Sequence, residues 1–278
     1  MSGLDGKFTV IIWGDFLMSK SVRTRIGRIL NVLNLRNFAR RLEKILMPEW
    51  FRPADASTPL AVKKALRIAV ENGLTSQGDY YEFGIYRGYT FWFAQKVMTE
   101  LGNLSMRFIG VDSFSGLPEL QEIDAYKGDF AKGQYSASFQ YVRKMLNRGG
   151  VDWNRTILVP GYFKDTLTRD LKTKYDLRSA AVVLIDCDLY ESTSEVLAFI
   201  SDMLLDGSIV LFDDWNAFDQ DNNRGERRAF QEFLNVCPHW VASPLFEYGL
   251  FGRVFRMGKQ PTTRSHNPIP TCTSAGIM

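Results

Sequence analysis

The sequence has few of the residues that build nitrogen or sulfur sites. It contains two histidines, His239 and His266, and three cysteines, Cys187, Cys237 and Cys272, and none of them stands at the spacing of a metal-binding motif. A histidine-driven mechanism is therefore not expected. So few cysteines, odd in number, favour a reducing, cytoplasmic location over a disulfide framework.

Long apolar runs are also missing. No run reaches the roughly 18 to 20 uninterrupted residues that a membrane span requires. The segment 1–18 contains an apolar patch, but Asp15 interrupts it and no small-residue cleavage site follows, so we expect no signal peptide. The net charge of +3 is too small to indicate a nucleic-acid partner, and we expect none.

What the sequence does contain is enough apolar material for one full domain. Its 278 residues are 45% hydrophobic and 13% aromatic, which is sufficient for a single large core. We expect a helical N-terminal extension or cap over 1–56 and a main domain over 57–258. A flexible tail rich in Pro, Thr and Ser is expected over 259–278.

The N-terminal region is basic and amphipathic. Residues 1–50 carry nine Lys or Arg against four Asp or Glu, and apolar residues recur at three- and four-residue steps over 21–47. This pattern predicts a helix, which could lie on an anionic membrane surface. We favour a helix packed on the main domain or on a second subunit, with its charged face in solvent, and we expect a homo-oligomer.

From residue 79 onward, apolar runs of strand length alternate with helical segments. The alternation predicts an α/β fold whose doubly wound, mostly parallel seven-stranded sheet is covered on both faces and carries an antiparallel hairpin at one edge. We expect helices over 57–72, 89–101, 135–147, 164–174, 190–205 and 225–236, and strands over 80–83, 108–111, 157–159, 181–185, 209–212, 240–246 and 250–255.

Two of the expected strands end in paired carboxylates. Asp186 and Asp188 follow the strand over 181–185, and Asp213 and Asp214 follow the strand over 209–212. A helix-length segment separates the two strands, so they should be parallel neighbours whose carboxyl ends meet at one edge of the sheet. We therefore expect three or four acids to converge there.

The first strand runs into a glycine-containing turn, E-F-G-I-Y-R-G-Y-T over 82–90. Gly84 and Gly88 would let the backbone pass close beneath a ligand, but their spacing is not that of the dinucleotide motif G-x-G-x-x-G. Glu82 would repel a diphosphate and attract the amino end of a cationic ligand. After the second strand, Asp112 is placed either to bind the hydroxyls of a ribose or to cap the following turn; beside the glycine turn, we favour the ribose.

Five segments, taken together, resemble the ordered motifs of the macrocin O-methyltransferase family. The resemblance covers roughly residues 57–257 and rests on E-F-G-I-Y-R-G at 82–88, G-V-D-S-F-S-G-L-P-E at 110–119, V-P-G-Y-F-K-D-T-L at 159–167, I-D-C-D-L-Y-E-S-T at 185–193 and F-D-D-W at 212–215. It implies a class I methyltransferase (Rossmann-like) fold, S-adenosylmethionine as methyl donor, and a divalent metal, usually magnesium. It also implies that the cofactor contacts Glu82, Gly84, Gly88, Asp112, Ser113, Phe114, Gly161, Tyr162 and Asp186.

The same resemblance implies that Asp186, Asp213 and Asp214 bind the metal and that Asp186 is also the catalytic base. Three hard oxygen donors suit Mg²⁺, Mn²⁺ or Ca²⁺ better than zinc. Taken alone, Asp214 could instead form a turn. Asp188 could support a metal ligand or cap the helix that follows, in which Ser192 and Glu195 match a capping box; we favour support.

The family's relatives methylate sugar hydroxyls, so the resemblance implies a sugar or a glycosylated natural product as acceptor. A phenolic or catechol-like hydroxyl is one alternative, and a non-catalytic, cofactor-binding assembly subunit is another. The loop over 121–134 is long enough to be a mobile lid. The charged start of the helix over 225–236 could contact the acceptor, but we favour a solvated face for Arg224, Glu226, Arg227 and Arg228.

Overall fold

The structure is a computed structural model that describes residues 55–127 and 130–260. The predicted helix over 21–47 lies outside these ranges, and so does nearly all of the predicted tail. The described residues from Ser57 onward form one compact unit. The limits predicted for the extension, the main domain and the tail remain predictions.

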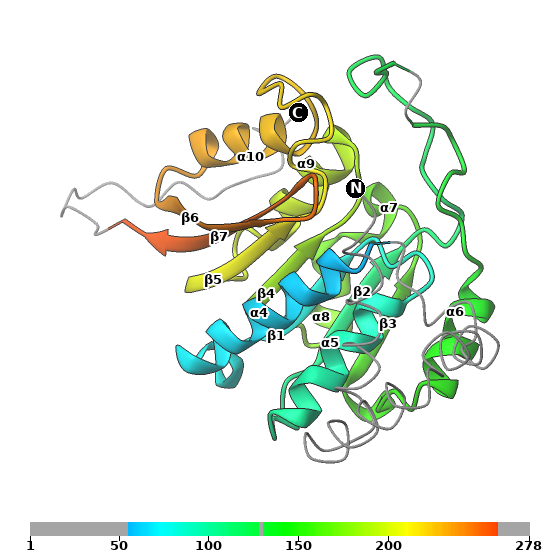
Figure 1. Ribbon diagram of the computed structural model, residues 1–278, viewed down its shortest axis with the longest axis vertical. Coiled ribbons are helices and arrows are strands. Elements are labelled where there is room, and N and C mark those ends of the chain that lie inside the picture. The colour runs from blue at the N-terminus through cyan, green and yellow to red at the C-terminus, as the bar shows by residue number, and fades with distance from the viewer. Residues whose placement is uncertain (1–54, 128–129, 261–278) are drawn as a thin grey trace, which may run out of the picture. The chain divides into compact units, whose positions relative to one another are not determined.

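One seven-stranded sheet forms the centre of the unit, with the strand order β3-β2-β1-β4-β5-β7-β6 (Figure 1). β7 runs antiparallel to both of its neighbours, β5 and β6, whereas the other neighbouring strands pair in parallel, which confirms the predicted fold class. Because β2 and β4 lie on opposite sides of β1, the strand order reverses between β1 and β4, where such sheets bind ligands. The strands are β1 (Asp79–Phe83), β2 (Phe108–Asp112), β3 (Thr156–Pro160), β4 (Ala180–Ile185), β5 (Leu204–Phe212), β6 (Trp240–Tyr248) and β7 (Gly252–Lys259).

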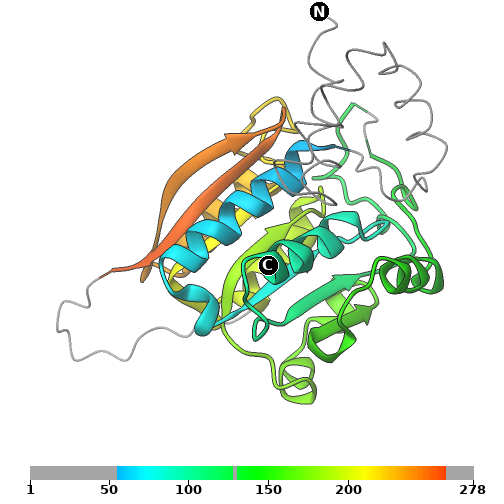
Figure 2. The same cartoon turned by 60° about the horizontal axis from the view of Figure 1, so that its bottom comes forward.

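Helices cover both faces of the sheet (Figures 1 and 2). On one face α4 packs beside α5, and on the other α9 packs beside α10. The helices are α4 (Ser57–Glu71), α5 (Tyr89–Glu100), α6 (Phe139–Arg148), α7 (Phe163–Thr166), α8 (Arg169–Lys174), α9 (Tyr190–Ile200) and α10 (Gly225–Val236), with short 3-10 turns η2 (Leu74–Ser76) and η3 (Trp153–Arg155).

The central strands are buried on both faces, as their continuous apolar sequence predicts. All five residues of β1 are buried. Tyr81 and Phe83 belong to the core that includes α8, α9 and α10, whereas the alternating side chains of Tyr80 and Glu82 point to the opposite face. Phe83 continues that core through edge-on contacts with Phe163 and Phe199, whose ring centroids are 5.9 and 6.4 Å away.

Several element boundaries differ from those predicted. The helix expected over 190–205 ends at Ile200, because β5 already begins at Leu204. The helix expected over 164–174 is split into α7 and α8, and Thr168 caps α8 by accepting a hydrogen bond from the Leu171 amide at 3.2 Å. Leu250 belongs to the β6–β7 turn rather than to a strand, and it is 83% exposed.

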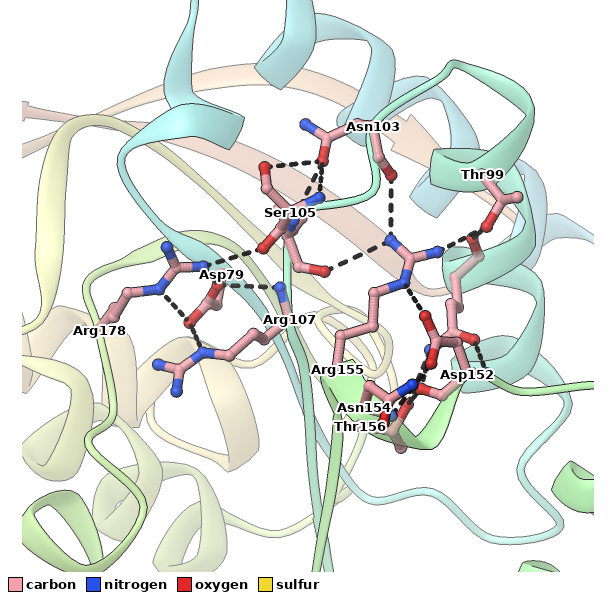
Figure 3. A network of polar contacts seen from close by, with 12 residues as sticks. Asp79, Thr99, Asn103, Ser105, Arg107, Asp152, Asn154, Arg155, Thr156 and Arg178 are labelled. Atoms are coloured by element: carbon pink, nitrogen blue, oxygen red, sulfur yellow. Dashed lines mark hydrogen bonds and ion pairs between the residues drawn. The ribbon is translucent and has the colours of Figure 1, made fainter.

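The amino ends of the strands are joined by ion pairs. Asp79, fully buried at the start of β1, accepts a hydrogen bond from Nε of Arg107 at 2.8 Å and pairs with Arg178 through both carboxylate oxygens (Figure 3). Arg155 lies nearby and pairs with Asp152 at 3.4 Å. These charges hold together the starts of β1, β2 and β4. The predicted chemistry lies at the opposite, carboxyl edge.

Candidate active site

The acids after β4 and β5 come together at the carboxyl edge of the sheet. The Asp186 amide donates to the Phe83 carbonyl at 2.9 Å, and the Asp213 amide donates to the Ile185 carbonyl at 3.0 Å. Each acid therefore extends the pairing of its strand by one residue. As expected from the sequence, Asp186, Asp213 and Asp214 converge: each offers a carboxylate oxygen, and these oxygens lie within 4.8 Å of one another.

The acids stand in a strongly negative environment. Burial raises the pKa of Asp186 well above its usual range, and repulsion from Asp213 and Asp188 adds to the rise. Burial likewise raises the pKa of Asp214, with repulsion from Asp188 and Glu226. A bound cation would relieve this repulsion. The three hard oxygen donors fit Mg²⁺, Mn²⁺ or Ca²⁺. Within the described residues, no cysteine thiolate or histidine imidazole belongs to this group.

Two hydroxyl groups from distant parts of the chain lie beside Asp213. The Thr58 hydroxyl, in the first turn of α4, donates to Oδ1 of Asp213 at 2.9 Å. The Tyr248 hydroxyl, at the end of β6, donates to the Phe212 carbonyl at 3.1 Å and lies beside Asp213: burial raises the pKa of this hydroxyl, and the charge of Asp213 adds to the rise. Sequence reasoning missed both residues, because nothing in their local patterns points to an acid so far along the chain.

Glu226 is buried beside the acids, so the prediction that it lies on a solvated face is wrong. Its side chain is in the first turn of α10 and only 1% exposed, and Oε2 accepts a hydrogen bond from the Asp214 amide at 3.0 Å. The prediction treated Glu226 like the arginines beside it in the sequence. Arg228 pairs at the surface with Glu232 at 2.8 Å, as a solvated face would, whereas Glu226 turns inward.

Asp188 lies beside Asp214 and does not cap α9. Its backbone is left-handed, with a φ of 62°, and burial raises the pKa of its carboxyl to about 7. The predicted capping box of Ser192 and Glu195 is wrong. Because α9 begins at Tyr190, both residues lie within the helix. The N-cap residue is Leu189, and its side chain makes no capping hydrogen bond.

The amino end of α9 is capped from a distance by Asp124. This carboxylate is 1% exposed, and its Oδ1 accepts a hydrogen bond from the Tyr190 amide at 2.7 Å. Asp124 comes from the loop between β2 and α6 in which the sequence predicted a lid. The same loop is held by Arg224, which donates to the carbonyls of Ile123 and Ala125 at 3.2 and 3.3 Å.

Further contacts tie the described parts of this loop to the segment between β5 and α10. The Tyr126 hydroxyl donates to Oδ2 of Asp219 at 2.6 Å, and Lys127 pairs with the same carboxylate. Tyr135, at the other end of the loop, lies near the acids: burial and the negative charges of Asp188 and Asp214 raise the pKa of its hydroxyl. No local pattern in the sequence indicates this placement.

The two glycines after β1 are required by their surroundings. Gly84 has a φ of 88°, and a Cβ there would lie 1.7 Å from the backbone oxygen of Asp186, so only glycine lets the ends of β1 and β4 meet. Gly88 has a φ of 84° and begins α5, and a Cβ there would meet Val142 of α6 at 3.1 Å. Packing thus accounts for both glycines, and their predicted contact with a cofactor stays a proposal.

Glu82 supports the turn from the sheet side. It is 1% exposed and accepts hydrogen bonds from the Tyr80 hydroxyl and from the Phe91 amide in the first turn of α5. It thereby caps a helix whose N-cap residue, Gly88, has no side chain. Burial raises the pKa of Glu82 to about 8.

Asp112 stabilises two turns at once. Its Oδ2 accepts hydrogen bonds from the amides of Ile85 and Tyr86 at 2.6 and 2.9 Å, and its Oδ1 accepts one from the Phe114 amide at 2.5 Å. The turn-capping alternative is therefore present in the structure. A carboxylate has about four acceptor positions, so Oδ1 keeps one that a ribose hydroxyl could fill.

The remaining predicted cofactor residues lie along the ends of β2 and β3. The Gly161 amide donates to the Asp112 carbonyl at 2.9 Å, which places the two strand ends side by side. Ser113 donates to the Gly116 carbonyl at 2.8 Å, and the Phe114 ring stands edge-on to Phe139 at 5.1 Å. Tyr162 is the N-cap residue of α7.

The strand order, with a glycine turn after β1 and acids after β4 and β5, defines the class I methyltransferase fold. Two solved structures share it: the calicheamicin methyltransferase CalS11, with a TM-score of 0.62 at 22% identity over 92% of this chain and 98% of that chain, and the O-methyltransferase NovP, with a TM-score of 0.61 at 21% identity over 72% and 79%.

The family follows from the sequence match. Residues 61–257 match the macrocin O-methyltransferase (TylF) family, and the chain belongs to this family. It is 30% identical over 182 residues to a tetracenomycin-type 4'-O-methyltransferase of Streptomyces olivaceus, covering 62% of this chain and 67% of the relative. It is 29% identical over 174 residues to demethyldecarbamoylnovobiocin O-methyltransferase of Streptomyces niveus, covering 59% and 64%. The match thus spans about two thirds of each relative.

These findings confirm the predicted family and an S-adenosylmethionine-dependent O-methyltransferase as the class of enzyme. Within the described ranges, no helix is long and apolar enough to cross a membrane.

Proposed function

We propose that this enzyme transfers the methyl group of S-adenosylmethionine to a hydroxyl of a sugar, free or attached to a small natural product. The observation that carries the proposal is the group of three acids at the carboxyl edge, next to the glycine turn after β1. The acceptor class is supported by the names of two relatives, which specify the 4'-hydroxyl of a rhamnosyl tetracenomycin and the 3''-hydroxyl of mycinamicin III.

Asp186, Asp213 and Asp214 would hold a divalent cation. When bound, such a cation lowers the pKa of a coordinated hydroxyl, which is otherwise too weak an acid to react near neutral pH. Support comes from the convergence of the three oxygens and from the repulsion that raises the pKa values of Asp186 and Asp214. Mg²⁺ is the proposed ion, with Mn²⁺ and Ca²⁺ as chemically similar substitutes.

The chain's own residues supply the base and the alignment. The acceptor oxygen forms a bond to the methyl carbon as the bond from that carbon to sulfur breaks, and the hydroxyl proton passes to a carboxylate. We assign that carboxylate to Asp186. Asp188, which lies beside Asp214, would help to hold that ligand in place. Most of the remaining rate enhancement comes from holding the two reactants in line.

The donor would lie over the ends of β1, β2 and β3. We place its methionine end near Glu82, Gly84, Gly88 and Asp186, its ribose at the remaining acceptor position of Asp112, and its adenine near Ser113, Phe114, Gly161 and Tyr162. The contiguity of the strand ends supports this placement. A homo-oligomer in the cytoplasm, with no nucleic-acid partner, completes the proposal, and light scattering would measure the subunit number.

Calorimetry with S-adenosylhomocysteine tests the donor site. We expect one site per chain, with affinity lost in Asp112→Ala and kept in Asp152→Ala, a surface substitution at the opposite edge. Absence of heat with the wild-type protein would contradict the proposed function. Mass spectrometry with a deuterated methyl donor would then separate a sugar acceptor from a phenolic one.

A further inference from the structure

One buried carboxylate oxygen near the acids has no hydrogen-bond partner. Glu226 uses Oε2 to accept from the Asp214 amide, whereas Oε1 is buried and bonded to nothing within the described structure. Burying a carboxylate without a full set of partners is costly. A glutamine could keep the bond to Asp214 without the charge, so the charge itself calls for an explanation.

Glu226 lies close enough to the proposed metal ligands to interact with their charges. Repulsion from Glu226 contributes to the raised pKa values of Asp186 and of Asp214. Burial raises the pKa of Glu226 itself well above its usual range, and repulsion from Asp213 and Asp188 adds to the rise. Glu226 therefore lies close to all four acids, and its Oε2 is bonded to the backbone of one of them. The amino end of α10 offsets part of this repulsion, because Glu226 lies in its first turn.

We propose that Glu226 is a positioning residue of the metal centre: Oε2 fixes the backbone of Asp214, and the charge on Oε1 stabilises the cation held by Asp186, Asp213 and Asp214. This rests on the metal role proposed above. Partners of metal ligands typically change metal affinity by about 10- to 100-fold when they are replaced. Without a cation, burial and the neighbouring acids disfavour the charge on Glu226, so removing it should weaken cation binding without weakening the fold.

Mn²⁺ binding measured by electron paramagnetic resonance tests the proposal without any turnover, because only the free ion gives a strong signal. We expect Glu226→Gln, which keeps an acceptor for the Asp214 amide, to weaken Mn²⁺ binding about tenfold. Glu226→Ala should weaken it further, because the bond to Asp214 is lost as well. Glu232→Gln is the matched control on the same helix: Glu232 pairs with Arg228 and Tyr190 at the surface, and its loss should leave Mn²⁺ affinity unchanged.

Thermal unfolding without and with Mn²⁺ separates this role from a purely structural one. Glu226→Gln should unfold at the wild-type temperature or higher without the ion, because it removes a buried repulsion, and should gain less when the ion is added. A Glu226→Gln protein that binds Mn²⁺ as tightly as wild type would overturn the proposal. Absence of Mn²⁺ binding by the wild type would overturn the metal role itself, and the role of Glu226 with it.

Discussion

The hydroxyl of Thr58 donates a 2.9 Å hydrogen bond to the carboxylate of Asp213, 155 residues further along the chain. This contact joins the first turn of α4, on one face of the sheet, to an acid at the end of β5. It orients one proposed metal ligand.

Replacing Thr58 by valine should weaken Mg²⁺ binding about tenfold, because Asp213 loses a donor while the packing volume is kept. Calorimetric titration with Mg²⁺ measures the change. Thr58→Ser keeps the hydroxyl and should behave like wild type. Equal affinities for the valine and serine variants would show that the bond has no part in metal binding.

Replacing Asp186 and replacing Asp188 should have different effects on cation binding and turnover. Asp186→Asn should abolish both cation binding and turnover, since we assign Asp186 as a ligand and as the base. Asp188→Asn should keep cation binding and lower kcat by about 10- to 100-fold, as expected for a residue that holds Asp214. If Asp188→Asn bound the cation normally yet lost all turnover, the base would be Asp188 and our assignment would be wrong.

Gly84→Ala should destabilise the fold strongly. Its Cβ would lie 1.7 Å from the Asp186 backbone oxygen, so the ends of β1 and β4 would have to separate. Gly102→Ala is the matched control, because Gly102 also has a left-handed φ, 77°, but has open space around it. Gly102→Ala should lower the free energy of unfolding by about 1 to 2 kcal/mol through backbone strain alone. Gly84→Ala should lower it several times more, and urea unfolding measures both changes.

Stability should fall between weakly acidic and weakly basic pH because of Glu82. The pKa of this group is about 8 in the folded protein against an ordinary value of 4.5, so folding favours the neutral form. Its contribution is complete below pH 4.5 and is lost as the pH rises through 8. Glu82→Gln should flatten the pH dependence of the free energy of unfolding in that window, and an unchanged slope would show that Glu82 is charged in the folded protein.

The fold was predictable because its signals are local. Each central strand is a short apolar run that alternates with a helical segment, and that order alone predicts a parallel sheet. The convergence of Asp186 and Asp213 followed from the same rule, since parallel neighbours end at one edge. The predicted capping box failed although the helix starts at Tyr190 as expected, because this start already places Ser192 inside the helix.

The surroundings of the acids were not predictable in the same way. Thr58 and Tyr248 reach Asp213 from α4 and β6, and no local pattern encodes contacts over such separations. Glu226 stands next to three arginines in the sequence, so the start of its helix looked uniformly exposed. Only the packing of α10 against the acids shows which charge turns inward.

The central claim is tested most directly by measuring methyl transfer at defined Mg²⁺ concentrations. Mass spectrometry would follow the transfer from deuterated S-adenosylmethionine to a sugar acceptor. We predict that wild-type enzyme stripped with EDTA is inactive and regains activity as Mg²⁺ is added, whereas Asp213→Ala stays inactive at every Mg²⁺ concentration. Equal turnover with and without Mg²⁺, or an active Asp213→Ala enzyme, would contradict the assignment of these acids to a metal-assisted O-methyltransferase site.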